Sequence, residues 1–266
     1  MSGRKEGIKV TGIKRGWPGR SPIVMLLAFC MVLGMTASAT FAAPINYGNF
    51  EGQGVWFNDV REDSSTSTPP LYQEPGVPIT VSSSTSGSTV VDQLVFSPDA
   101  DFASFSPTST GANADTTDGV LKFTLQAKPG QTISSVRLTE FGDWSLVVLS
   151  GGEAIVNVGG GLFAVEGANS SQSTINVSGL PANFTTTSSG TWNGWAELDL
   201  SAFAGDAIKI SLDNTLQTAS MNGAAFIAKK GFAIEVTSVP EPGTMILLAG
   251  GAVAMLYRRG RQNAAA

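Results

Sequence analysis

The sequence predicts a single all-β domain, a jelly-roll-like β-sandwich. Three observations support this prediction within residues 44–238: stretches in which apolar and polar residues alternate, turn-forming clusters of Ser, Thr, Gly, Asn and Asp between them, and no helical period longer than two turns. Since helices do not separate the predicted strands, the spacing of βαβ units is absent, which argues against a parallel sheet. We therefore expect a sandwich of about 8 to 12 strands.

The alternation is clearest in residues 121–125, 208–212 and 232–236. Each stretch places an apolar side chain at every second position, which is typical of a strand with one buried face. Shorter stretches of similar β-branched and aromatic content predict further strands at residues 55–61, 90–96, 136–141, 144–149, 154–158, 162–166, 174–177 and 196–200.

Four hydroxyl-rich segments are expected to be loops or flexible stretches. They contain too few apolar side chains to contribute to a core, and Ser, Thr, Asp and Gly favour turns. These segments are residues 63–70, 82–89, 106–119 and 185–190.

The N-terminus has the composition of a secretory signal peptide, expected over residues 1–42. Six Lys and Arg residues precede an apolar stretch at 23–35, and the small residues 37–39 offer a cleavage site, with a second candidate site after Ala42. Cys30 lies inside the apolar stretch. Its removal would leave a mature protein without cysteine, so neither disulfides nor thiolate chemistry are expected.

The C-terminal segment, residues 239–266, predicts a marginal membrane helix. Residues 244–257 carry no charge and would span roughly 21 Å as a helix, which is short of a bilayer core of about 30 Å. Arginines follow directly, and positive charge on the cytoplasmic side would leave the preceding domain outside the cell. Pro240 and Pro242 prevent the helix from extending backward and leave an extended Pro-Glu-Pro stretch.

This segment resembles the PEP-CTERM sorting signal of Gram-negative bacteria, which is also labelled as the C-terminal domain of ice-binding proteins. The resemblance implies export through the secretion translocon, an inner-membrane intermediate, and removal of the tail by a membrane exosortase. It further implies a product at the cell surface, outer membrane or extracellular matrix. An ordinary single-span anchor is the alternative, but it gives Glu241 no role. The matching residues are Val239, Pro240, Glu241, Pro242, the stretch 243–257, Arg258, Arg259 and Arg261.

The predicted extracellular domain, residues 43–238, is strongly acidic. Between residues 44 and 238 there are 19 acidic and 7 basic residues, a net charge of −12, whereas basic ends reduce the whole-chain value to −5. This charge makes nucleic acid and anionic lipid poor partners of the domain, and no nucleic-acid partner is expected.

The chain contains no histidine, which excludes Ser-His-Asp and Cys-His catalysis and histidine-ligated zinc. No catalytic residue is predicted. A carbohydrate-active hydrolase would need paired carboxylates. Glu197 and Asp199 are one candidate pair, but they share the face of a strand opposite its apolar residues, which is typical of a solvated outer face. Glu140 and Asp143 are the other pair. They flank Gly142 at an expected tight turn between two strands, where acidic residues and glycine are favoured for backbone reasons alone.

The acidic segments also make a structural calcium ion a candidate cofactor. Calcium prefers several carboxylate and carbonyl oxygens from a loop, and the ligands to consider are Glu51, Asp115 and Asp118. Asp118 followed by Gly119 is equally a turn that precedes the strand at 120–125.

Trp195 is the candidate contact to carbohydrate. If Trp192 is in register with the apolar positions of the strand that follows, Trp192 faces the core and Trp195 faces outward. Exosortase systems are associated with exopolysaccharide production, so the resemblance implies contact with matrix polysaccharide. We therefore expect a non-enzymatic surface or matrix protein, with a carbohydrate-active hydrolase or a self-associating surface-layer protein as alternatives.

Overall fold

The computed structural model describes residues 44–64, 71–73, 76–98, 103–203, 207–241 and 243. All of them belong to one compact unit, residues 39–266. The predicted signal peptide lies outside the described part of the chain, and so does the apolar stretch 244–257. Within it, no helix combines the length and the apolar character needed to cross a membrane.

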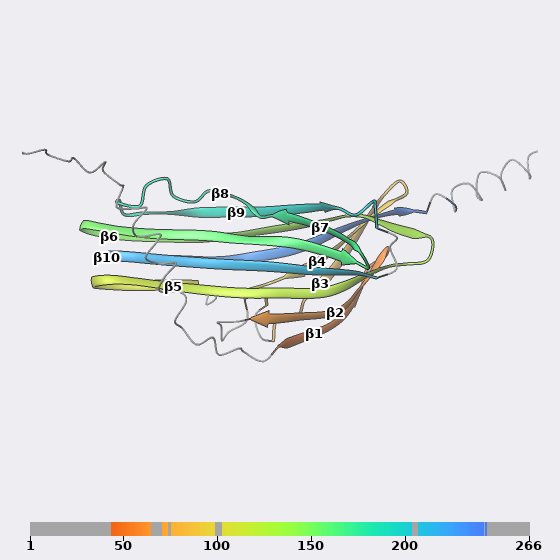
Figure 1. The fold of residues 1–266 in the computed structure, drawn as a ribbon, viewed down its shortest axis with the longest axis horizontal. Helices are drawn as coiled ribbons and strands as arrows, with labels where there is room; N and C mark the ends of the chain where they lie inside the picture. The colour runs from red at the N-terminus through yellow and green to blue at the C-terminus, as the bar shows by residue number, and fades with distance from the viewer. Residues whose placement is uncertain are drawn as a thin grey trace, which may run out of the picture. The chain divides into compact units, whose positions relative to one another are not determined.

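The prediction of an all-β protein is confirmed. The described residues form ten strands in one antiparallel sheet, in the order β1-β2-β5-β10-β6-β9-β8, with β4 also paired to β10, β3 to β4, and β7 to β6 (Figure 1). The strands are β1 (Ile45–Glu51), β2 (Val55–Ser64), β3 (Thr80–Ser86), β4 (Thr89–Phe96), β5 (Ala103–Ala127), β6 (Gln131–Glu166), β7 (Asn169–Thr174), β8 (Asn176–Ser178), β9 (Ser188–Asp199) and β10 (Ile208–Pro240).

Three of these strands are long enough to turn back on themselves. β5, β6 and β10 contain 25, 36 and 33 residues, whereas strands usually have about 3 to 10. Residues 209–221 of β10 pair with residues 153–165 of β6, but residues 223–240 pair with residues 131–148. β10 turns back between its two parts, since the side chains of Asn214 and Lys229, 15 positions apart on this strand, are in contact. Asn222, with a φ of 56°, and Gly151, with a φ of 71°, lie between the paired parts of β10 and β6.

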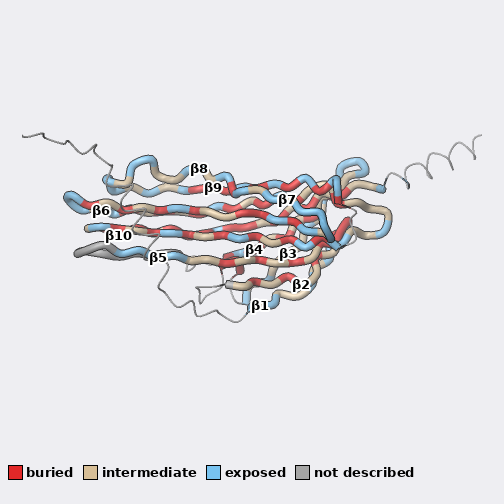
Figure 2. Tube along the Cα trace, in the orientation of Figure 1, coloured by how far each residue is buried: buried red, intermediate tan, exposed pale blue. Residues whose placement is uncertain are grey.

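The reversals divide the sheet into two layers (Figure 1). The first layer contains β1, β2 and β7 with residues 112–127, 153–166 and 208–221 of the long strands. The second contains β3, β4, β8 and β9 with residues 103–108, 131–148 and 223–240. Buried side chains alternate with exposed ones along the strands (Figure 2). Those that point inward form one hydrophobic core cluster, in which Phe57, Phe96 and Trp192 are among the largest side chains.

Two of the hydroxyl-rich segments predicted as loops are mainly strands. Residues 82–86 belong to β3, and residues 106–119 lie inside β5, where residues 106–108 and 112–119 pair with β10. Residues 188–190 likewise open β9. The prediction was wrong here because backbone pairing to neighbouring strands holds these segments, and an outward face has no need of apolar side chains.

Candidate functional site

The outward-facing side chains of the second layer form a polar and aromatic surface, which we call the outer face. One row of directly paired residues crosses five neighbouring strands. Directly paired residues of antiparallel strands share a face, so these side chains all point away from the core. The row consists of Ser82, Gln93, Glu235, Arg137 and Glu197.

A second row carries the exposed tryptophan. Trp195 pairs with Thr139, which pairs with Ala233 on β10. The Trp195 side chain is 46% exposed. The guanidinium carbon of Arg137 lies 5.9 Å from the centroid of the Trp195 ring, within the range of a cation–π interaction. Arg137 thus packs beside the indole, and part of the indole surface remains open to solvent.

The predicted orientations of the two tryptophans are confirmed. Trp192 is fully buried, and its indole Nε1 donates a hydrogen bond to the backbone oxygen of Ala228 at 3.0 Å. Trp195 faces outward because side chains alternate along β9. Trp192 therefore contributes to the core, and Trp195 alone of the two is accessible to a ligand.

Phe141 adds a second exposed aromatic side chain to the outer face, with 53% of its surface exposed. Its ring covers Gly231 on the neighbouring strand, where a Cβ atom would meet the ring. Phe141, Thr139, Lys230 and Ala233 help to line a depression of about 230 Å³. Apolar and polar groups are thus combined in one shallow surface.

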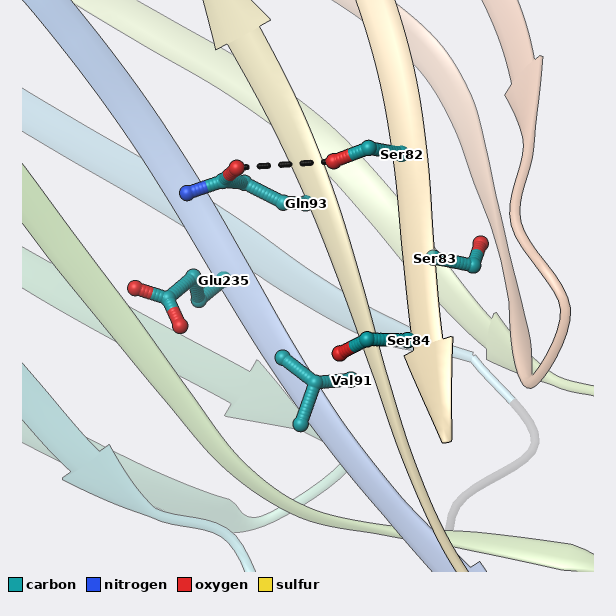
Figure 3. A pocket seen from close by; sticks show the side chains of 6 residues that line it. All are labelled: Ser82, Ser83, Ser84, Val91, Gln93 and Glu235. Carbon is teal, nitrogen blue, oxygen red and sulfur yellow. Dashed lines mark hydrogen bonds between the residues drawn. The ribbon is translucent and has the colours of Figure 1, made fainter. Parts of the chain in front are cut away.

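A second depression of about 350 Å³ lies across β3, β4 and β10. Figure 3 shows that Ser82, Gln93 and Glu235 bring a hydroxyl, an amide and a carboxylate to it from three adjacent strands. The Ser82 hydroxyl donates to Oε1 of Gln93 at 3.4 Å. Ser83 contributes to the same depression, but its hydroxyl bonds to the buried Asp92. Such groups are donors and acceptors suited to sugar hydroxyls.

The candidate calcium ligands are not brought together. Glu51 lies at the end of β1, where its carboxylate forms a salt bridge of 2.6 Å with Lys128. Asp118 lies within β5 and accepts a hydrogen bond of 2.7 Å from the Thr215 hydroxyl. Asp115 is three residues away on the same strand, so the two side chains leave it on opposite sides. Among the residues that the structure describes, no group of three or more carboxylates could hold a metal ion.

Glu140 and Asp143 do not form a carboxylate pair. They lie on opposite sides of β6: the Glu140 side chain is fully buried, whereas Asp143 is half-exposed and 3.4 Å from Lys230. The expected tight turn around Gly142 was wrong, because β6 continues through it. A Cβ atom at Gly142 would meet the Ala228 carbonyl oxygen and the Trp192 indole. Glycine is therefore required here by close packing.

Glu140 belongs instead to a buried polar cluster with Asn214 and Lys229. The Lys229 Nζ atom lies 2.8 Å from Oε2 of Glu140 and 2.8 Å from Oδ1 of Asn214. Nδ2 of Asn214 lies 3.0 Å from each carboxylate oxygen. Burial lowers the pKa of Lys229, and the charge of Glu140 opposes that shift. Sequence analysis missed this cluster.

Two aromatic rings enclose the ammonium group of Lys229. Its Nζ atom lies 4.8 Å from the centroid of Tyr72 and 5.3 Å from that of Phe232. The inward orientation of Lys229 depends on a register shift between Lys229 and Gly231. Alternation counted back from Phe232 would place Lys230 inside and Lys229 outside. The glycine after the two lysines is the only sequence signal for such an irregularity.

Two further buried carboxylates hold the backbone of neighbouring segments, and sequence analysis missed both. Asp92 accepts hydrogen bonds from the backbone N–H groups of Gln53, Gly54 and Val55 at 2.7, 2.8 and 3.0 Å. Glu62 accepts hydrogen bonds from the backbone N–H groups of Leu71 and Tyr72 at 2.5 and 3.3 Å, and one from the Tyr47 hydroxyl at 2.6 Å. Burial raises the pKa of Tyr47, and the Glu62 carboxylate raises it further. These contacts give the two carboxylates structural roles.

The first residues of the predicted sorting motif are part of the sheet. Val239 pairs with Thr132 and Pro240 with Gln131, so β10 extends two residues beyond the predicted domain end at residue 238. The exposed Glu241 donates its backbone N–H to the Gly130 oxygen at 3.0 Å. The other predicted motif residues, Pro242, Arg258, Arg259 and Arg261, lie outside the described part of the chain.

Comparison with known families identifies this C-terminal segment. The family described as the PEP-CTERM protein-sorting motif matches residues 238–262. The match confirms the resemblance seen in the sequence and indicates an exported protein that an exosortase processes and sorts to the surface or the extracellular space. No curated protein and no solved structure matches the chain.

Proposed function

We propose that the protein is a non-enzymatic component of the cell surface or extracellular matrix that contacts exopolysaccharide through its outer face. The sorting motif supports export and exosortase processing. The observation that carries the polysaccharide contact is the exposed indole of Trp195, held by Arg137 beside a row of polar side chains.

The chemistry of this surface suits a sugar polymer. The face of an indole packs against the C–H groups of a sugar ring, and hydroxyl, amide and carboxylate groups bond to its hydroxyls. These groups are spread over five strands in an open surface with two shallow depressions. Such a surface can follow an extended chain over several sugar units. The net charge of −12 between residues 44 and 238 favours a neutral or weakly charged polysaccharide.

Co-sedimentation with the extracellular polysaccharide of the producing cell tests this proposal. The recombinant protein should comprise residues 44–241, so that Val239 and Pro240 complete β10. We expect saturable binding that Trp195→Ala abolishes. Phe163→Ala is the matched control, because Phe163 is an exposed aromatic residue of the first layer. Equal binding by both variants and the unchanged protein would reject a role for the outer face.

The same assay separates the alternative functions. Binding in calcium and in chelator tests the expected structural calcium, and release of reducing sugar would indicate a hydrolase. Self-association has one structural observation in its favour: Val147, Leu149 and Met221 are exposed apolar residues near the reversal points of β6 and β10. Sedimentation that depends on protein concentration, without binding to polysaccharide, would favour the structural-layer alternative.

A further inference from the structure

The buried cluster of Glu140, Asn214 and Lys229 brings together an amine, a carboxamide and a carboxylate in the interior of the protein. We infer that this cluster is a self-modification site at which Lys229 and Asn214 become joined by an intramolecular isopeptide bond, with release of ammonia and with Glu140 as the group that moves protons. The inference concerns the interior of the domain and is independent of the proposed polysaccharide contact.

The geometry places the reacting groups in contact. Nζ of Lys229 lies 2.8 Å from Oδ1 of Asn214, and the Cγ atom to which Oδ1 is bonded is the atom that the amine would attack. The two residues come from the two halves of β10, and the reversal at Asn222 brings these halves together in opposite layers. Because folding fixes both groups, the reaction is intramolecular and the entropic cost of bringing the reactants together is met in advance.

The surroundings favour the neutral, nucleophilic form of the amine. The side chains of Lys229 and Glu140 are fully buried, and burial lowers the pKa of Lys229. The rings of Tyr72 and Phe232 pack around the nitrogen. A desolvated lysine next to an acceptor for its proton is an activated nucleophile, and exclusion of water protects the intermediate from hydrolysis.

Glu140 reaches both nitrogens that exchange protons. Its Oε2 atom lies 2.8 Å from Nζ of Lys229, and both of its oxygens lie 3.0 Å from Nδ2 of Asn214. These separations are within the range for direct proton transfer by a general acid or base.

The reaction is balanced without any further reactant. Glu140 first takes a proton from the Lys229 ammonium group, which gives an amine and a carboxylic acid. The amine attacks Cγ of Asn214, a new C–N bond forms, and the electron pair moves to Oδ1. When the carbonyl reforms, the bond from Cγ to Nδ2 breaks. Glu140 delivers a proton to Nδ2 and accepts one from Nζ, so that ammonia leaves and Glu140 ends as the acid.

The reaction also removes the electrostatic cost of the buried ion pair between Lys229 and Glu140. A buried ion pair is costly because both charges lose their hydration. In the product the lysine cation has become a neutral amide and Glu140 is protonated, so none of the three groups is charged. The bond connects the two layers through residues that are 15 positions apart.

Peptide mass spectrometry of the protein isolated from the producing cell tests the inference. Trypsin cleaves after Lys209 and, in an unmodified chain, after Lys229. With the bond present, Lys229 is resistant, and the peptide of residues 210–230 is lighter than its sequence mass by one ammonia, about 17 Da. Single backbone breaks between residues 214 and 229 should release no fragments, because these residues are closed into a ring.

Substitution of each residue of the cluster tests its role in the reaction. Lys229→Met, Asn214→Leu and Glu140→Ala should each abolish the mass loss. Lys230→Arg is the matched control: it changes the exposed neighbouring lysine, preserves a trypsin site and should keep the mass loss. If a cluster variant fails to fold, the result for the unchanged protein still decides the question.

Two results would overturn the inference. One is a folded, unchanged protein in which residues 210–229 are recovered at full sequence mass, with cleavage after Lys229. The other is a loss of ammonia in a peptide that is still cleaved after Lys229, because this would show a cyclic imide at Asn214 instead of a bond to lysine.

Discussion

Trp192 and Trp195 lie three residues apart on β9 and point to opposite sides of the sheet. Trp192 is fully buried and bonds to the Ala228 oxygen, whereas Trp195 is nearly half-exposed beside Arg137. One residue thus belongs to the core and the other to the outer face, although both are the same amino acid in the same strand.

Alanine substitution should separate these two roles. Trp192→Ala removes a large buried side chain and should lower the free energy of unfolding by about 3 to 5 kcal/mol. Trp195→Ala should change it by less than about 1 kcal/mol, because the side chain lies at the surface. Urea denaturation followed by circular dichroism measures both values. Similar losses in the two variants would contradict the assignment of Trp195 to a binding surface.

Loss of the buried carboxylate of Glu140 should be far more costly than loss of its exposed neighbour. In protein in which Lys229 and Asn214 are not joined, Glu140→Gln leaves the Lys229 cation buried without its counter-charge, and we expect destabilisation by about 3 to 5 kcal/mol. Asp143→Asn disrupts a half-exposed pair with Lys230 and should cost about 0 to 1 kcal/mol. Thermal unfolding of the two variants provides the comparison, and equal melting temperatures would be evidence against the buried pair.

Asp92 should stabilise the turn between β1 and β2. Its carboxylate accepts three backbone hydrogen bonds from residues 53–55, and an amide at this position would direct hydrogen-bond donors toward some of these N–H groups. Asp92→Asn should therefore destabilise the fold by about 1.5 to 3 kcal/mol. Hydrogen exchange should show the loss first at residues 53–55, and unchanged protection there would refute the assignment.

The stability should respond to pH through Asp213. Partial burial raises the pKa of Asp213, and the Asp118 carboxylate raises it further. Because the pKa of Asp213 is higher in the folded state, its contribution to the free energy of unfolding is fully present at pH values below the ordinary pKa of 3.8. This contribution is lost as the pH rises through the folded-state pKa. Asp213→Asn should thus melt at a higher temperature than the unchanged protein at pH 7, and this advantage should disappear below about pH 4.

Asp199→Asn is a control for which the opposite change in melting temperature is expected. Hydrogen bonds from the side chain and backbone of Ser201 lower the pKa of Asp199, so its contribution is present above the unfolded pKa and is lost in acid. This variant should melt at a lower temperature than the unchanged protein at pH 7, with the difference shrinking in acid. If both variants shifted in the same direction, these electrostatic assignments would be wrong.

Processing should occur at the end of β10. The protein recovered from the producing cell should end near residues 239–242, and Glu241→Gln should leave the tail attached. Because Val239 and Pro240 are paired with β6, cleavage within the motif requires either local opening of this end or processing before the sheet is complete. Intact-mass measurement decides this, and a mature chain that still includes Arg261 would contradict processing.

Much of the fold follows from the alternation of side chains. The buried positions 121, 123 and 125, and 232, 234 and 236, are correctly predicted because each apolar residue faces the core. The same rule correctly orients Trp192 and Trp195. Pairing of hydroxyl-rich segments could not be predicted, because the hydrogen bonds that hold residues 106–119 come from β10, about a hundred positions away in the chain.

The buried cluster could not be predicted because it depends on an irregularity. Lysine is rarely buried without a partner, and simple alternation places Lys229 at the surface. The register shift after Lys229 reverses this orientation, and the reversal of β10 then brings Asn214 within reach. The predicted turn at Gly142 was wrong for a related reason. Its sequence neighbours suggest a turn, whereas glycine is needed there because the Trp192 side chain of another strand leaves no space for a Cβ atom.

The pairing of β10 also determines how the protein responds to a pulling force. A load applied at the C-terminus enters at Pro240 and runs along the strand, which is bonded to β6 on one side and to β4 on the other. Antiparallel hydrogen bonds lie perpendicular to the strand, so this load shears many of them at once. The end of the chain that carries the sorting motif is therefore the end at which the domain can bear tension.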